Sequence, residues 1–117
     1  MALIENLQRH DLNPVEEAKA FQFLLREHRL TQEELARRLG CSRPTVANSL
    51  RLLSLPSEIQ AELETGVLSA GHARALMPLP RVRDQLLAWK EFQKAQLSVR
   101  QAELWVRKRL EKQKGSL

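Results

Sequence analysis

A single glycine between two short helix-forming segments constrains the fold of this chain more than any other feature. The first segment begins at Thr31 and carries Glu34 three positions later, which is the pattern of a capping box. Gly40 follows its last apolar residue, where helices commonly end in a left-handed conformation. Ser42 then offers the cap of a second helix. The sequence thus predicts two short helices that are joined by a tight turn and must pack against each other.

Cap, proline and glycine signals of the same kind recur along the chain. We find no period-two alternation, no repeat and no low-complexity tract, and aromatic residues make up only 4% of the sequence. The predicted fold class is all-α, a helix-turn-helix domain of about seven helices with a small C-terminal helical subdomain. These signals place the helices at about residues 14–28, 32–39, 43–53, 57–64, 70–77, 81–94 and 99–110.

Apolar residues at helical spacing define the faces expected to point inward. The final residues, which are polar and basic, are expected to fray. The inward residues predicted for the first three helices and the last two are Ala18, Phe21, Leu24, Leu25, Leu35, Ala36, Leu39, Val46, Ala47, Leu50, Leu53, Val82, Leu86, Trp89, Phe92, Val99, Ala102, Val106 and Leu110.

The distribution of charge favours a polyanionic partner. The formal net charge is +5, and residues 35–57 contain four arginines with no acidic residue. Residues 65–83 contain three arginines and again no acid. The lone Cys41 has no partner for a disulfide or a zinc site, and no apolar run reaches membrane-spanning length. We therefore expect a cytoplasmic protein that binds no metal and, lacking a nucleophile–base pair, catalyses no reaction.

Residues 31–53 have the pattern of a DNA-binding helix-turn-helix. A helix-turn-helix needs a small residue where its two helices cross and a residue that tolerates positive φ in the turn. It also needs a branched apolar residue where the second helix packs on the first. Ala36, Gly40 and Val46 meet these needs. A plain helical hairpin inside a bundle would explain the same three residues. It would not explain why the second helix carries no acid and turns polar and basic side chains outward.

The predicted DNA contacts follow from placing the second helix in the major groove. Arg43 is the candidate for a bidentate contact to guanine, and Asn48 for a contact to adenine or phosphate. Ser42 and Thr45 would bind phosphate at the helix N-terminus. Gln32, which opens the first helix, would touch the DNA backbone, and Arg51 would contact phosphate or form a surface salt bridge.

Three stretches together resemble the ParB family of partition proteins, which includes the KorB and Noc proteins. They lie at residues 2–18, at residues 31–56 and at Leu68-Ser-Ala-Gly-His-Ala-Arg-Ala-Leu76. The resemblance implies specific binding of double-stranded DNA at a parS-like inverted repeat, with one copy of the domain on each half-site. It also implies a role in chromosome or plasmid segregation at the bacterial nucleoid.

The resemblance adds roles for single residues. Arg43 and Ser49 lie at base-reading positions, and Gly71 lies at a discriminating position where Noc-like members carry a basic residue. Gly71 therefore favours parS over the Noc site. Ser69, His72 and Arg74 would brace the DNA backbone, although His72 could instead be a packing residue.

The resemblance also divides the chain. Residues 1–12 would be a remnant of an N-terminal nucleotide-binding domain, 13–80 the helix-turn-helix domain, and 81–117 a C-terminal helical subdomain with a basic tail. Glu5, Asn6 and Arg9 resemble part of a motif that holds CTP and magnesium in full-length relatives. The Gly-Glu-Arg-Arg signature of that pocket is missing, so we expect no CTP binding or hydrolysis by this chain. A ParA-type ATPase would bind regions that are not present here.

Three alternatives remain open at this stage. The chain could be a nucleotide-switch fragment that keeps CTPase activity, which a phosphate-release assay would detect. It could be an adaptor that docks a ParA-type ATPase, although the acid-free second helix suits DNA better. It could also be a Noc-like or KorB-like relative that binds a different operator, and the glycine at position 71 argues against the Noc-like case.

Overall fold

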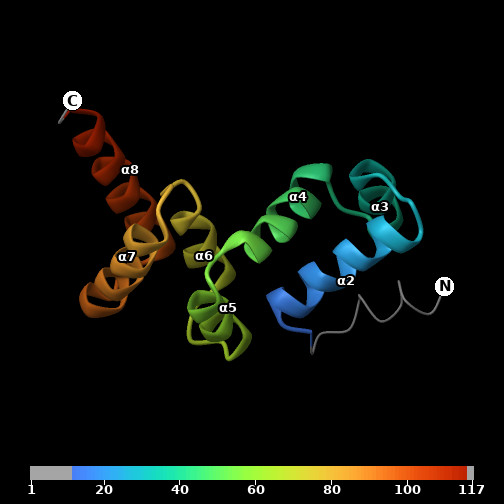
Figure 1. The fold of residues 1–117 in the computed structure, drawn as a ribbon, viewed down its shortest axis with the longest axis horizontal. Coiled ribbons are helices and arrows are strands. Elements are labelled where there is room, and N and C mark those ends of the chain that lie inside the picture. The colour runs from blue at the N-terminus through green and yellow to red at the C-terminus, as the bar shows by residue number, and fades with distance from the viewer. Residues whose placement is uncertain (1–11, 116–117) are drawn as a thin grey trace. The chain divides into compact units, whose positions relative to one another are not determined.

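A computed structural model describes residues 12–115, and the regular structure in that range is entirely helical (Figure 1). The all-α prediction is confirmed. Contacts divide the chain into two compact units, the first ending at Val67 and the second beginning at Leu68. The elements are α2 (Pro14–Glu27), α3 (Gln32–Leu39), α4 (Arg43–Arg51), η1, a 3-10 turn (Leu52–Ser54), α5 (Ser57–Glu64), α6 (Ala70–Leu76), α7 (Val82–Ala95) and α8 (Val99–Gly115).

Side-chain caps begin most of these helices, as the sequence predicts. Asn13 and Thr31 each form a full capping box. The cap side chain accepts from the backbone N–H of the third helical residue, and the side chain of that residue, a glutamate, accepts from the backbone N–H of the cap. Ser42 and Ser69 accept from the backbone of Thr45 and His72, respectively. Ser98 and Gln101 make the reciprocal pair at the start of α8. These bonds satisfy N–H groups that have no partner within the helix.

The first unit is organised around α2, which contacts α3, α4, η1 and α5. The buried cluster that joins α2, α3 and α4 contains Phe21, Leu24, Leu35, Ala36 and Val46. Neither short helix would be stable alone in water, so their stability comes from this packing. The packed side of α4 is thereby turned toward α2 and α3, which leaves its other side for contacts outside the protein.

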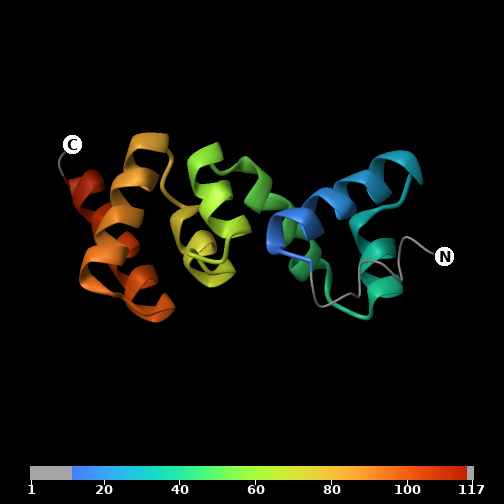
Figure 2. The same cartoon turned by 90° about the horizontal axis from the view of Figure 1, so that it is seen from below.

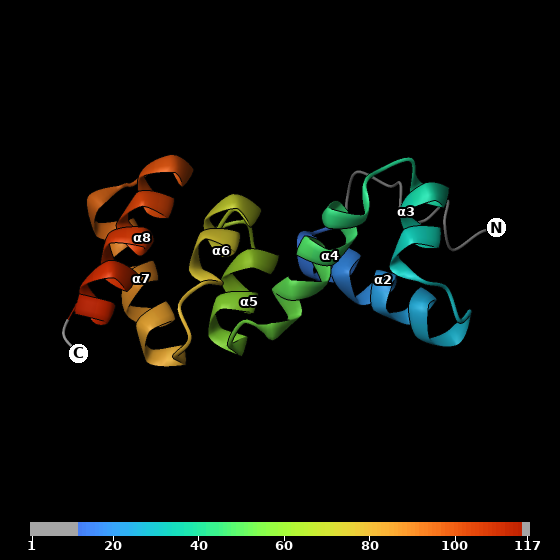
Figure 3. The same ribbon diagram turned by 90° about the horizontal axis from the view of Figure 1, so that it is seen from above.

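The second unit packs α6 against both α7 and α8. Figures 2 and 3 show these three helices (yellow to red) from below and from above. Phe92 of α7 meets Trp105 of α8 edge to face, with ring centroids 5.8 Å apart. Ala88, Ala102 and Val106 are buried in the same unit. Small alanines allow these helices to approach closely.

The structure corrects several details of the sequence prediction. The predicted third helix ends as an α-helix at Arg51 and tightens into η1 rather than continuing to residue 53. Val82, predicted to point inward, is 54% exposed because the buried face of α7 begins later, at Ala88. The last helix extends to Gly115, since residues 107–114 contain strong helix formers and no glycine or proline.

The division of the chain by contacts falls between Val67 and Leu68. The helix α6 belongs with α7 and α8, because its buried side packs on them. Gln85 reinforces this grouping by donating to the carbonyl of Leu79, 3.1 Å away, in the turn after α6. Within residues 12–115, no helix is long and apolar enough to cross a membrane.

Replacing Leu24 by alanine should destabilise the first unit by about 2–5 kcal/mol, because it leaves a cavity in a fully buried site. Phe23→Ala is the matched control, since Phe23 lies next to Leu24 on α2 but is 47% exposed. We expect it to cost under about 1 kcal/mol. Urea unfolding followed by circular dichroism measures both. Equal losses would contradict the described core.

Candidate nucleic-acid interface

The N-terminus of α4 presents a group of polar residues outside the core. Ser42 caps the helix, and its hydroxyl oxygen lies 2.8 Å from that of Thr45. Arg43, the first helical residue, is exposed, and so are Thr45 and Arg51. Val46 is fully buried among these residues. The arrangement exposes hydroxyl groups and a guanidinium at the positive end of the helix, where anions are stabilised.

Not all the predicted members of this surface are equally exposed. Asn48 and Ser49 are half-buried, as is Gln32 at the first position of α3. Thr45 and Ser42 are bound to each other, so each hydroxyl approaches a ligand with one hydrogen-bonding position already occupied. The seven residues predicted in this unit lie on α3, on α4 or at the cap of α4; they are Gln32, Ser42, Arg43, Thr45, Asn48, Ser49 and Arg51.

The turn before α4 fixes how the two helices meet. Gly40 has φ of +73°, a left-handed conformation that side chains disfavour. Its N–H donates to the carbonyl of Arg37, and the N–H of Cys41 donates to that of Ala36. These bonds close the end of α3, and two residues later Ser42 begins α4. The glycine predicted for the turn is thus confirmed in its conformation.

The start of α3 carries an acid, Glu34, whose pKa is lowered. The backbone N–H of Thr31 donates to the Glu34 carboxylate at 3.1 Å, and this bond lowers the pKa of that carboxyl. A hydrogen bond with the Thr31 side chain and the charges of Arg37 and Arg38 lower it further. The carboxylate is thereby occupied in capping α3.

The four predicted residues of the second patch, Ser69, Gly71, His72 and Arg74, lie on α6 or at its cap. Arg74 is exposed. The imidazole of His72 has both nitrogens engaged within the protein. Nε2 donates to the carbonyl of Leu97 at 2.8 Å, and in that tautomer Nδ1 accepts from the Ser69 hydroxyl at 2.6 Å.

Aromatic rings complete the surroundings of His72. Its ring centroid lies 6.5 Å from that of Trp89 and 6.2 Å from that of Phe92, both on α7. Of the two roles considered for His72, these contacts favour packing over a direct contact with DNA. The side chain ties α6 to the segment that leads into α8.

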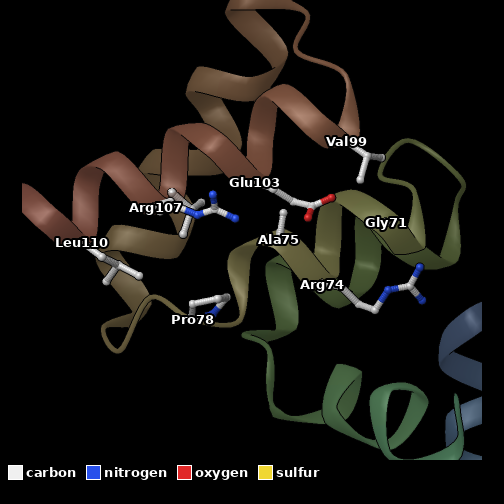
Figure 4. A pocket seen from close by; sticks show the side chains of 9 residues that line it. Gly71, Arg74, Ala75, Pro78, Val99, Glu103, Arg107 and Leu110 are labelled. Carbon is white, nitrogen blue, oxygen red and sulfur yellow. The ribbon is translucent and has the colours of Figure 1, made fainter. Parts of the chain in front are cut away.

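A groove runs between α6 and α8 beside these residues (Figure 4). Figure 4 shows Val99 over the start of α6 and shows Arg74 and Arg107 extending in different directions from the two helices. A methyl carbon placed on Gly71 would lie 2.8 Å from Cγ2 of Val99. The groove is lined by Gly71, Arg74, Ala75, Pro78, Val99, Glu103, Val106, Arg107 and Leu110.

Val99 and Leu97 are the site neighbours that sequence reasoning missed. Val99 was expected only to point inward, and no local pattern connects either residue with α6. The sole signal was the Ser98–Gln101 cap, which places a helix start at this point.

Glu5, Asn6 and Arg9, predicted as a vestigial CTP and magnesium motif, lie outside the described residues. Among residues 12–115, no three His, Cys, Asp or Glu side chains gather as metal ligands would.

Comparisons with known proteins agree on one family. The model of the ParB HTH domain matches residues 10–111. A chromosome-partitioning protein Spo0J from Thermus thermophilus is 59% identical over 103 residues, covering 88% of this chain and 38% of that protein. A nucleoid occlusion protein from Bacillus thuringiensis is 49% identical, covering 97% of this chain and 39% of that protein. The chain thus spans under half the length of these relatives.

Solved structures match as well. The DNA-binding domain of a chromosome-partitioning protein ParB, complexed to the centromeric parS site, has a TM-score of 0.85 and 44% identity, covering 92% of this chain and 86% of that one. A C-terminally truncated ParB from Caulobacter crescentus, complexed with CTP-gamma-S, has a TM-score of 0.58 and 45% identity, covering 76% and 48%.

The cap of α3 should make the stability of the chain depend on pH. Because folding lowers the pKa of Glu34, its contribution is present above the unfolded value of 4.5 and is lost as pH falls through the folded value. The drop in unfolding midpoint from about pH 6 to about pH 3 should be smaller in Glu34→Gln, which keeps a capping amide but does not titrate. An identical drop in both proteins would show that the cap adds no pH dependence.

His72→Ala should lower the stability of the second unit by about 1–3 kcal/mol, because Leu97 loses its donor and the aromatic cluster loses a ring. Thermal unfolding measures this change. His28→Ala is the control, since that histidine is exposed at the C-cap of α2. A variant that binds DNA more weakly yet unfolds at the wild-type temperature would instead mark His72 as a DNA contact.

Proposed function

Because the chain belongs to the ParB family of helix-turn-helix domains, we propose that it binds a parS-like inverted repeat in double-stranded DNA and serves chromosome or plasmid segregation. One observation carries this proposal. The first turn of α4 exposes Arg43 and two hydroxyl groups beside a positive helix end, and no acid opposes a phosphate there. The match to a ParB domain complexed with parS supports it.

In the proposed mechanism, some residues contact base edges and others contact the phosphate backbone. Arg43 extends from the first turn of α4, where a helix placed in the major groove meets base edges, and its planar guanidinium suits guanine O6 and N7. Asn48 and Ser49 lie further along the same helix and would read or position adjacent bases. Ser42 and Thr45 would hold phosphate together with the first backbone N–H groups, and Arg51 would add a phosphate contact.

The inverted repeat requires two copies. A half-site presents one major-groove face, so each copy would place its own α4 on one half of the repeat. Gln32 would contact the DNA backbone from the start of α3, and Arg74 from α6. The net charge of +5 supports the phosphate contacts in general, which makes binding sensitive to salt.

A second candidate is the operator of a nucleoid occlusion protein. The 49% identity to such a protein keeps this function in consideration. Gly71 favours parS as the site, because Noc-like members of the family that this chain resembles carry a basic residue at this position. A duplex with that operator therefore belongs in the same binding experiment, and preference for it over parS would replace the parS proposal.

We propose further properties only for a longer protein that would contain this chain. There, a ParA-type ATPase would be the partner, the nucleoid the location, and CTP with magnesium the cofactor. The CTP-gamma-S complex of a structural relative supports the nucleotide. For this chain by itself we expect no CTP hydrolysis, and phosphate release measured with and without parS tests that expectation.

The direct test is fluorescence anisotropy with a parS duplex and a scrambled duplex at about 50 and about 200 mM salt. We expect tighter binding to parS, and a preference that persists at the higher salt, because base contacts release no counterions. Equal, strongly salt-dependent binding to both duplexes would leave a DNA-binding domain but remove the parS assignment.

Arg43→Ala should weaken binding to parS by about 1–3 kcal/mol and change binding to the scrambled duplex little. Arg26→Ala, an exposed arginine in the last turn of α2, is the matched control and should change neither value. A loss of the same size on both duplexes would show that Arg43 holds phosphate and reads no base.

A further inference from the structure

The contact between Gly71 and Val99 is too close to leave room for a side chain on α6. A methyl carbon on Gly71 would lie 2.8 Å from Cγ2 of Val99 and 3.2 Å from Cγ1. Carbon atoms in favourable contact are about 3.5–4.0 Å apart. Gly71 lies inside a helix and has no positive φ, so its backbone does not require glycine. The requirement comes from the side chain of Val99.

Val99 has little freedom to withdraw. It is the first residue of α8 and is β-branched, so the two Cγ atoms on its Cβ restrict rotation about χ1. The preceding residues are held as well, because Ser98 caps the helix and the carbonyl of Leu97 accepts from His72. The same two residues of α6, Gly71 and His72, therefore contact the same short segment before and at the start of α8.

We infer that Val99 is a positioning residue that decides which side chains position 71 can carry and, through α6, where Arg74 is presented. A larger residue at position 71 moves α6 away from α8 unless position 99 is smaller. This inference rests on the proposed function for its consequence in DNA binding. It differs from the expectation that position 71 discriminates by meeting DNA itself, since the steric partner is a residue of this protein.

The geometry predicts a specific rescue. Once the two Cγ atoms are removed, the nearest atom of residue 99 to the new methyl carbon is Cβ at 3.6 Å, an ordinary contact. Val99→Ala should therefore relieve Gly71→Ala without any movement of the helices. A valine elsewhere gives the matched control. Val82 begins α7 in the same unit, and its 54% exposed side chain is not among the atoms that a methyl on Gly71 would meet.

The experiment compares Gly71→Ala, Val99→Ala, the double variant, and Gly71→Ala combined with Val82→Ala. Alanine is the better helix former, so without the contact Gly71→Ala would raise the unfolding midpoint. We expect it to lower the midpoint by several degrees and parS affinity by about threefold. In the double variant, Gly71→Ala should cost neither stability nor affinity relative to Val99→Ala alone. Val82→Ala should restore nothing.

Two results would overturn the inference. An unchanged or raised midpoint in Gly71→Ala would show that α6 has room for a side chain. Loss of parS affinity that Val99→Ala does not relieve would show that residue 71 meets DNA directly. Gly71→Lys, with and without Val99→Ala, repeats the comparison with the larger residue. If the unmodified chain shows no preference for parS, the proposed function fails, and the unfolding measurements alone still decide the packing inference.

Discussion

The burial of Val46 is the contact on which the first unit and the exposed polar side of α4 depend. The helices α3 and α4 have eight and nine residues, lengths at which isolated helices do not persist in water. Val46 packs into the cluster with Leu35 and Leu24, and this burial holds both helices against α2. The same packing fixes the rotation of α4 about its axis. With the Val46 side of α4 buried against the core, Arg43 and Thr45 are exposed to solvent.

Sequence alone could predict what depends on near neighbours. The caps at Asn13, Thr31, Ser42, Ser69 and Ser98 join residues three apart, so their chemistry is visible in the chain. Gly40 was predictable for the same reason, because one turn between two caps requires a residue that accepts positive φ. The exposed members of α4 then followed from helical periodicity. Their roles on DNA depend on a partner, and for that reason they remain predictions.

The remaining features depend on residues far apart in sequence. The bond from His72 to the carbonyl of Leu97 spans 25 positions, and no local pattern marks its acceptor. The resemblance places Gly71 at a discriminating position, and no local pattern reveals that Val99 lies beside it. Val82 was placed inward by spacing alone, although the first fully buried residue of α7 is Ala88. The packing of α6 against α7 and α8 could not be predicted for the same reason, since a cap and a turn look alike whichever helices pack on them.

These two kinds of interaction give the two groups of site residues different tolerance to change. On α4, the exposed Arg43 and Arg51 lie outside the core around Val46, so their replacement should leave the fold undisturbed and change only contacts outside the protein, which we propose are with DNA. On α6, Gly71 and His72 take part in packing, and a substitution there changes the joint with α8 before it changes any contact with DNA. If the proposed DNA contacts hold, a change of DNA preference through α4 would need one substitution. If Val99 positions α6 as we infer, a change through α6 would also need an accommodating substitution at Val99 on α8.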